Sequence, residues 1–216
     1  MGARIALVRH GETDWNAQKR LQGQTDIPLN DAGRDQARVA ARELERLAHD
    51  GGAWDLLVSS PLGRAMETAA IIGARLGLEA IAPVHDLQER HFGEGEGQVV
   101  EGMDPVEVQR LLDTAEPDDA VTARALEALR DIVAAHRGAD IVVVAHGTLI
   151  RLVVGSLLEM RHPHVENGQV IGIDADLLTV PEPGDVGGTP DVEDLTGEPG
   201  GNQGFADSPS SAPASR

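Results

Sequence analysis

Two histidines follow apolar runs in the same way at distant points of the chain. His10 follows residues 5–8 and comes directly after Arg9, whereas His146 follows residues 141–145 and precedes Gly147. In open α/β sheets, ligands bind just beyond the carboxyl ends of the strands. Two histidines at equivalent strand ends therefore favour a shared site over two isolated polar residues at loop entrances.

A third apolar run leads into residues 59–64, and this segment places Arg64 in the first turn of an expected helix. There its charge opposes the helix macrodipole, an arrangement that favours a nearby anion. Arginine supplies planar, bidentate donors that suit a phosphate dianion. Each unit charge pair at about 4 Å contributes roughly 4 kcal/mol at an effective dielectric of 20. Two arginines and a protonatable histidine therefore predict a site for a phosphoryl group.

The elements that must position these residues alternate between strand-like and helix-like patterns. We expect strands over residues 4–8, 55–59, 80–84, 141–145, 169–174 and 177–180. We expect helices over residues 31–51 (with Asn30 as the N-cap), 60–77, 104–113, 118–136 and 148–159. Continuous apolar strands that alternate with helices predict a three-layer α/β/α sandwich with a mostly parallel central sheet.

Composition divides the 216-residue chain near residue 180. Residues 1–180 carry the strand and helix patterns, and we expect them to form one domain with its own core. Residues 181–216 are rich in Pro, Gly, Ser and acidic residues and contain few large apolar side chains. Such a segment cannot bury enough apolar surface to offset its ordering entropy, so we predict a disordered acidic tail.

Charge and composition exclude several classes of protein. Acidic residues outnumber basic ones 36 to 18, a formal net charge of −18, which argues against binding nucleic acid or an anionic membrane. There is no cysteine, no apolar run long enough to span a bilayer and no recognisable leader. We expect a soluble, cytoplasmic protein, either a monomer or a homodimer. Asp174 and Asp176 form an Asp-x-Asp pattern after an apolar run, which is typical of aspartyl-phosphate enzymes. We expect these two residues to lie in a surface hairpin instead.

An ordered set of short motifs resembles the signature of the histidine phosphatase superfamily, the phosphoglycerate-mutase-like proteins. The motifs are residues 7–13 (Leu-Val-Arg-His-Gly-Glu-Thr), 15–16, 22–23, 26–29 with Gly33, 59–61 with Arg64 and Thr68, 87–89 with Phe92 and Gly93, 145–147, and Asn167. They span about residues 4–180. The resemblance implies a phosphoglycerate-mutase-like fold and phosphoryl chemistry that requires neither a metal ion nor another cofactor.

The resemblance also implies a role for each residue that carries the chemistry. His10 would be the nucleophile that forms a phosphohistidine. Arg9, Arg64 and His146 would hold the phosphoryl oxygens and offset the charge of the transition state. Glu89 would protonate the leaving alkoxide and then deprotonate the attacking water.

Five further residues are candidates for binding the substrate. Asn16 and Gln22 match motif positions that line the phosphate pocket in the family, and Gly23 follows Gln22 in the same motif. Asn16 and Gln22 are also suited to capping loop turns. The backbone N–H groups of Gly147 and Thr148 begin a helix, where an anion is favoured.

The acidic segment 94–119 bears on the choice between a phosphatase and a mutase. It contains nine acidic residues and one base, Arg110, and lacks the basic insertion of the cofactor-dependent mutases. Such a rim would repel a bisphosphate, so we favour a phosphomonoesterase that acts on a small phosphate ester with a neutral or cationic leaving group. A cofactor-dependent phosphoglycerate mutase and a non-catalytic phosphate-binding module of the same fold remain the alternatives.

Overall fold

A single mixed sheet organises the chain, of which the computed structural model describes residues 2–179 and 192–194. The strands are β1 (Arg4–Arg9), β2 (Leu56–Ser59), β3 (Ile141–Ala145), β4 (Val170–Asp174) and β5 (Val192–Asp194). They lie in the order β2-β3-β1-β4-β5. β2, β3 and β1 are parallel, β4 is antiparallel to β1, and β5 is antiparallel to β4. The described sheet is therefore mixed, with three neighbouring parallel strands at its core, as predicted, and antiparallel pairing on the β4 side.

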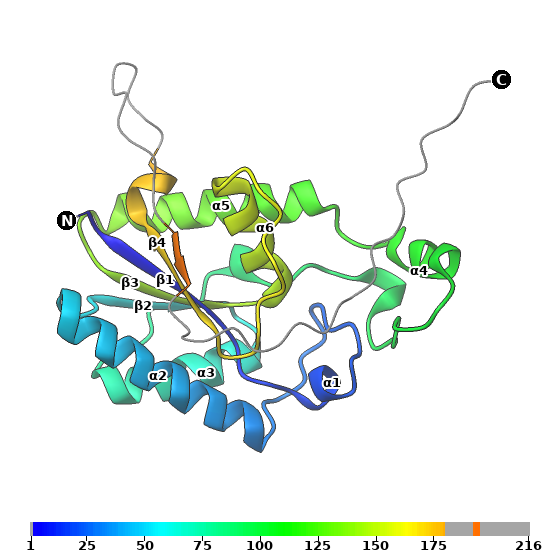
Figure 1. Cartoon of the computed structure of the whole chain (residues 1–216), viewed down its shortest axis with the longest axis horizontal. Coiled ribbons are helices and arrows are strands. Elements are labelled where there is room, and N and C mark those ends of the chain that lie inside the picture. The colour runs from blue at the N-terminus through cyan, green and yellow to red at the C-terminus, as the bar shows by residue number, and fades with distance from the viewer. Residues whose placement is uncertain (1, 180–191, 195–216) are drawn as a thin grey trace, which may run out of the picture.

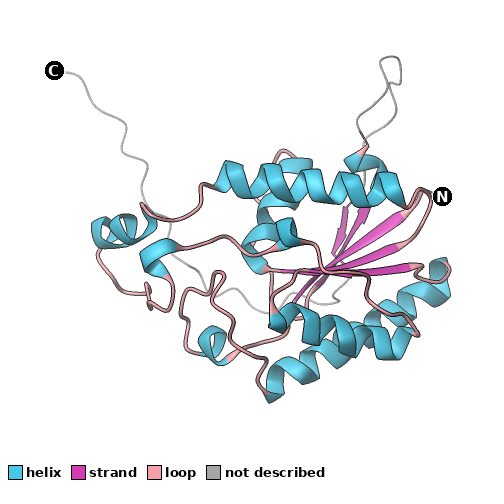
Figure 2. Ribbon diagram, turned by 180° about the vertical axis from the view of Figure 1, so that it is seen from behind, coloured by secondary structure: helices cyan, strands magenta, loops and turns pink. Residues whose placement is uncertain are grey.

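Helices cover both faces of the sheet. They are α1 (Asp14–Ala17), α2 (Asp31–Gly51), α3 (Gly63–Leu76), α4 (Pro105–Leu112), α5 (Asp118–Ala135) and α6 (Gly147–Leu157), with the 3₁₀ turns η1 (His85–Leu87), η2 (Gly93–Gly95) and η3 (Ala175–Leu178). Figures 1 and 2 show α2 and α3 on one side of the sheet and α5 and α6 on the other. This arrangement confirms the three-layer α/β/α prediction.

Side-chain alternation along β1 explains the two layers, because successive residues of a strand point to opposite faces. Ile5 and Leu7 pack in the core formed with α5 and α6. Ala6 and Val8 pack in the core formed with α2 and α3. Every residue of β3 is buried, as expected for a strand covered on both faces.

Several element boundaries follow from local chemistry. The Asn30 side chain caps α2 by accepting from the Gly33 N–H at 2.8 Å, as predicted, and Gly52 is its C-cap. α3 begins at Gly63 rather than near Pro61, because the Ser60 N–H still donates to the Val144 carbonyl of β3 at 3.0 Å. The short helix α1 was not expected, although Thr13 and Asn16 form the capping box that starts it.

Two expected strands are absent from the described residues. Residues 80–84 form one isolated bridge, from Ala80 to Leu57, and no strand follows, since Pro83 lacks an N–H and the segment is half-exposed. Residues 175–178 form η3 instead of a strand, and the expected hairpin is replaced by this turn, because the Asp174 side chain caps it by accepting from the Asp176 N–H.

The predicted acidic tail lies outside the described residues except at positions 192–194. These three residues form β5, whereas the composition of the segment had indicated no regular structure there.

None of the helices among the described residues has the length and apolar character that a membrane span requires. In Figure 1, α1 and α4 lie at the end of the molecule toward which β1 runs, so they flank the carboxyl ends of the parallel strands.

Candidate active site

Three parallel strands bring the predicted residues together at their carboxyl ends. β1 leads into His10, β3 leads into His146, and β2 leads into the first turn of α3, which carries Arg64. The His10 N–H donates to the Ala145 carbonyl at 3.0 Å, so the backbone ladder itself sets the two histidines side by side. Their ring centroids lie 5.2 Å apart with the rings inclined at 60°. The prediction of one shared site at the sheet edge is therefore reflected in the geometry.

The hydrogen bonds of His10 define which ring nitrogen can react. Its Nδ1 lies 2.7 Å from the Gly11 carbonyl oxygen, which can only accept, so Nδ1 carries the proton. The Arg64 Nε–H donates to His10 Nε2 at 3.2 Å, which requires a lone pair on Nε2. Burial, then Arg64 and Arg9, hold the pKa of His10 well below its usual 6.5. The ring is therefore neutral at pH 7 and presents Nε2 as a nucleophile.

Arg64 is completely buried and is held by backbone carbonyls. Its Nη2 donates to the Gly23 carbonyl at 2.6 Å and its Nη1 donates to the Thr25 carbonyl at 3.0 Å. Burial lowers the pKa of Arg64 to about 10, against the opposing effect of Glu89 and Asp26, so the guanidinium stays charged at neutral pH. A fixed buried cation next to His10 Nε2 is suited to stabilise charge that develops on a phosphoryl group.

The loop that receives Arg64 is fastened by a carboxylate of the acidic segment. Glu96 accepts from the Gln24 N–H at 3.0 Å and the Thr25 N–H at 2.9 Å. A Cβ at Gly23 would lie 2.7 Å from the backbone carbonyl oxygen of Arg90 and 2.2 Å from Glu96 Oε1, so a larger residue would require the backbone to shift. Gly23, predicted to bind the substrate, thus orients Arg64 through its carbonyl.

Arg9 binds backbone and side-chain groups of the loop before β4 through Nη1, and its Nε has no partner among the described residues. Its Nη1 donates to the Val165 carbonyl at 2.6 Å and lies 3.3 Å from His164 Nε2. A Cβ at Gly147 would lie 3.0 Å from Arg9 Nε, so Arg9 packs directly against the start of α6. Burial lowers the pKa of Arg9, while Glu89, Glu166 and Glu12 act to raise it.

Three buried side-chain nitrogens have no hydrogen-bond partner among the described residues. They are Arg9 Nε, Gln22 Nε2 and His146 Nδ1, and no other buried side-chain nitrogen or oxygen of the described residues is without a partner. Buried polar groups are nearly always paired, so three orphans in one site call for an explanation. Arg9 precedes His10, His146 faces it, and Gln22 precedes Gly23, which holds Arg64. A phosphoryl group, with several acceptor oxygens, would pair all three.

Gln22 and Asn16 are anchored at their oxygen ends. Gln22 Oε1 accepts from the Thr13 hydroxyl at 2.6 Å, which leaves its amide nitrogen as the unpaired donor. Asn16 Oδ1 accepts from the Thr13 N–H at 3.1 Å and from Asn167 Nδ2 at 3.2 Å. Asn16 therefore caps α1, one of its two predicted roles, whereas Gln22 also has a donor for a ligand.

Glu89 lies at the N-terminus of α6 with 5% of its surface exposed. Its carboxylate accepts from the Thr148 N–H at 3.0 Å, from the Leu149 N–H at 3.1 Å and from the Arg90 N–H at 2.9 Å. The Thr148 amide, predicted to bind phosphate, is thus engaged with Glu89 in this structure. To donate a hydrogen bond to a bound phosphate, the Thr148 N–H would first have to release Glu89.

Three contributors to the site were given no role in the sequence analysis. The Thr68 hydroxyl accepts from the Gly11 N–H at 3.1 Å, and its place one helical turn after Arg64 was the available signal. Ser60 Oγ lies 2.7 Å from His146 Nε2, and it follows the strand that leads to Arg64. Arg124 donates to the carbonyls of Asp86 and Gln88 and so holds the chain that carries Glu89; no local pattern pointed to it.

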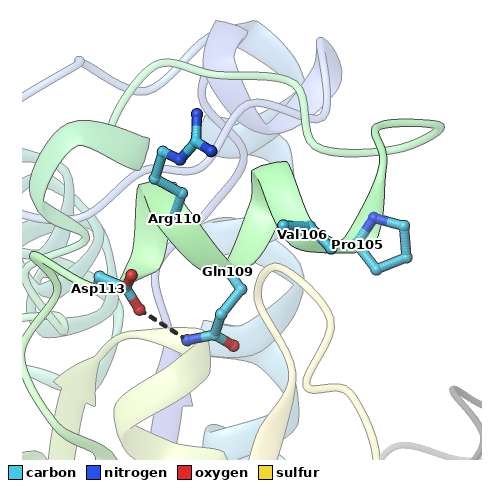
Figure 3. Close-up of a pocket in the computed structure, with 5 residues that line it drawn as sticks. All are labelled: Pro105, Val106, Gln109, Arg110 and Asp113. Carbon is cyan, nitrogen blue, oxygen red and sulfur yellow. Dashed lines mark hydrogen bonds between the residues drawn. The ribbon is translucent and has the colours of Figure 1, made fainter.

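A shallow surface hollow of about 360 Å³ lies on α4, away from these residues. It is lined by Pro105, Val106, Gln109, Arg110 and Asp113, with a hydrogen bond between Gln109 and Asp113 (Figure 3). All five residues come from α4 and the residue after it, and none of them was predicted to act on a substrate. The histidine cluster therefore remains the candidate active site.

Comparisons with known proteins agree with this geometry. The family description "Histidine phosphatase superfamily (branch 1)" matches residues 5–176. Phosphoglycerate mutase-like protein 4 of Arabidopsis thaliana is 38% identical over 176 residues, 74% of this chain and 72% of that protein. The uncharacterized phosphatase PhoE of Bacillus subtilis (strain 168) is 38% identical over 146 residues, 68% of this chain and 72% of that protein.

A solved structure shows the same fold. A mycobacterial glucosyl-3-phosphoglycerate phosphatase in complex with VO3 superimposes with a TM-score of 0.69 at 29% identity, covering 80% of this chain and 92% of that one. The predicted fold and the predicted enzyme class are confirmed by these matches. On the strength of the family match and of relatives that align over more than two thirds of their length, the chain belongs to the histidine phosphatase superfamily, branch 1.

Proposed function

We propose that the protein is a metal-independent phosphomonoesterase that hydrolyses a small phosphorylated metabolite through a phosphohistidine at His10. The observation that carries this proposal is the group of three unpaired buried donors around the neutral His10 ring. They supply hydrogen bonds for phosphoryl oxygens, while Arg9 and Arg64 supply positive charge that a metal ion would otherwise provide.

In the first step the Arg64 Nε–H leaves His10 Nε2 for a phosphoryl oxygen. The freed Nε2 lone pair attacks phosphorus as the bond from phosphorus to the ester oxygen breaks. Glu89, as the general acid, gives a proton to the leaving alkoxide, so that an alcohol departs. The Gly11 carbonyl holds the proton on His10 Nδ1 and stabilises the ring as it becomes positively charged. The product is a phosphohistidine in contact with Arg9, Arg64 and His146.

In the second step water attacks the phosphohistidine and the bond between phosphorus and Nε2 breaks. Glu89, now a carboxylate, takes a proton from that water, and inorganic phosphate is released. Three backbone N–H groups fix the position of Glu89 beside the site. His10 returns to the neutral state that its burial beside two arginines favours.

Hydrolysis is favoured over mutase activity by the pairing of the basic residues near the acidic segment. Arg124 is paired with Glu116 at 2.7 Å, Arg90 with Asp118 at 2.8 Å, and Arg110 lies on α4 in the hollow away from His10. None of these cations is placed to receive the second phosphate of a bisphosphate. We therefore propose leaving groups that are neutral or cationic, such as a sugar or an amino acid.

A cytoplasmic location and the choice between monomer and homodimer stay predictions of the sequence.

The test is phosphate release from an aryl phosphate in excess EDTA by the wild type, by His10→Ala and by His136→Ala. His136 is an exposed histidine at the end of α5 and serves as the matched control. We expect turnover by the wild type and by His136→Ala, and none by His10→Ala. Brief incubation with radiolabelled substrate followed by quenching at alkaline pH should trap a phosphoenzyme only when His10 is present.

Three outcomes would contradict the proposal. Turnover by His10→Ala would remove the nucleophile assignment. Failure of the wild type on aryl, sugar and amino-acid phosphates, combined with interconversion of phosphoglycerates in the presence of a bisphosphate primer, would establish the mutase instead. Binding of inorganic phosphate without either activity would indicate the non-catalytic module.

A further inference from the structure

Ser60 and His146 form a buried pair at the junction of two parallel strands. Both residues are fully buried, with 0% of their surface exposed. Ser60 follows β2, and its N–H donates to the Val144 carbonyl of β3 at 3.0 Å, which fixes its backbone. Its Oγ lies 2.7 Å from His146 Nε2, a short distance for this type of hydrogen bond.

The direction of this hydrogen bond follows from the remaining partners of Ser60. The Leu62 N–H lies 3.4 Å from Ser60 Oγ and can only donate, so it uses a lone pair of the hydroxyl oxygen. Among the hydrogen bonds of the described residues, His146 Nε2 is the acceptor left for the hydroxyl proton. The hydroxyl therefore donates to Nε2, and the proton of the neutral imidazole lies on Nδ1.

The opposite direction would leave two buried groups unsatisfied. If His146 Nε2–H donated to Ser60, the hydroxyl proton would have no acceptor, and His146 Nδ1 would be an unpaired lone pair. An anionic substrate cannot satisfy an acceptor, whereas it satisfies an N–H donor at once. Burial, then Arg64, His10 and Arg9, lower the pKa of His146 well below its usual value, which keeps the ring neutral and makes its tautomer decisive.

We propose that Ser60 is a positioning residue that holds His146 in the Nδ1–H tautomer, so that Nδ1 donates to an oxygen of the phosphoryl group. This inference rests on the proposed function, because that function supplies the phosphoryl oxygen that accepts the hydrogen bond from His146 Nδ1. The choice of tautomer depends on which partner the other ring nitrogen has, and here that partner is the Ser60 hydroxyl.

The first test is spectroscopic and independent of activity. Long-range ¹H–¹⁵N spectra of histidine-labelled protein distinguish a protonated ring nitrogen from an unprotonated one, and the His146 signals are assigned by their absence in His146→Asn. We expect protonated Nδ1 and unprotonated Nε2 in the wild type. In Ser60→Ala we expect loss of that pure tautomer, whereas Ser59→Ala should retain it. Ser59 is the neighbouring buried serine, and no hydrogen bond joins its side chain to His146 in the described structure.

The second test is kinetic and uses inorganic phosphate as a competitive inhibitor. Ser60→Ala should lower kcat by about tenfold or more and weaken phosphate inhibition by a similar factor, on the scale typical of removing a residue that orients a ligand-binding histidine. Ser59→Ala should leave both values within threefold of the wild type.

Three results would overturn the inference. They are a wild-type His146 protonated at Nε2, a Ser60→Ala protein that keeps the Nδ1–H tautomer, and equal kinetic losses in both serine variants. Failure of the proposed function is recognised separately. In that case the wild type shows the Nδ1–H tautomer and its loss in Ser60→Ala, yet neither of the two hydrolyses a phosphate ester.

Discussion

Two replacements of Arg64 separate the effect of its positive charge from the effect of its guanidinium hydrogen bonds. Arg64→Met keeps most of the bulk and removes the charge, whereas Arg64→Lys keeps the charge and removes the planar guanidinium. The native side chain donates to His10 Nε2, to the Gly23 carbonyl and to the Thr25 carbonyl. Both variants lose the first of these contacts, and neither can restore all three.

The expected magnitude follows from these contacts. Removing one preorganised donor from a site that stabilises developing negative charge costs about 10²–10³ in rate, or roughly 3–4 kcal/mol. We expect kcat/KM to fall by about that factor in both variants. In Arg64→Met the carbonyls of Gly23 and Thr25 are also left without a donor, which should cost about 1–3 kcal/mol of folding free energy for each.

The pH dependence distinguishes the two variants. Arg64 is, after burial, the largest cause of the lowered pKa of His10, so loss of its charge raises that pKa toward the usual value. Attack requires neutral His10, so the acid limb of kcat/KM should move to higher pH in Arg64→Met. In Arg64→Lys, which retains a cation, the acid limb should stay near that of the wild type.

The assay is the pH profile of kcat/KM on an aryl phosphate, with thermal unfolding as the check on folding. Arg75→Met is the matched control, because Arg75 lies on the same helix, is half-exposed and pairs with Glu45 away from the site. It should change neither kcat/KM nor the pH profile. A loss smaller than tenfold in a folded Arg64→Met protein would refute the reasoning, and so would an acid limb that stays in place.

Two further predictions concern the acid/base residue and the side chain that holds it. Glu89→Gln should lower kcat for an alkyl phosphate by about 10²–10⁴ but affect an aryl phosphate far less, because an aryl oxide leaves without a proton; equal losses on both substrates would argue against general-acid catalysis. Arg124→Met removes donors to the carbonyls of Asp86 and Gln88 and the pair with Glu116, so both kcat and the melting temperature should fall, while Arg130→Met, an exposed arginine on the same helix, should leave both unchanged. Wild-type kcat in Arg124→Met would show that Glu89 keeps its place without this support.

The strand ends were the most predictable part of the site. His10 and His146 were identified because each follows an apolar run, and parallel strands bring their carboxyl ends to one edge of the sheet. The ordered motifs added Glu89, which no strand pattern would have placed beside α6. The partners of each atom were not predictable, because they depend on distances between segments far apart in the chain. The bond between Glu89 and Thr148 and the bond between Ser60 and His146 are of this kind.

The errors in the predicted fold have local causes. Residues 80–84 have the β-branched and apolar character of a strand, but Pro83 removes a donor and little of the segment is buried. A 3₁₀ turn forms where a strand was expected at residues 177–180, because the Asp174 side chain caps that turn. β5 lies in a segment whose composition favours no structure, and its pairing is set by an available edge of β4 rather than by its own propensity.

The position of β5 has a consequence for how the protein behaves at high concentration. β5 pairs along Ile171, Gly172 and Ile173 of β4, and so covers the backbone N–H and C=O groups on that edge of the sheet. An uncovered strand of this apolar character is a template for pairing with a second molecule. A chain that ends before residue 192 would therefore expose the apolar edge of β4. Its first defect would be self-association rather than loss of catalysis.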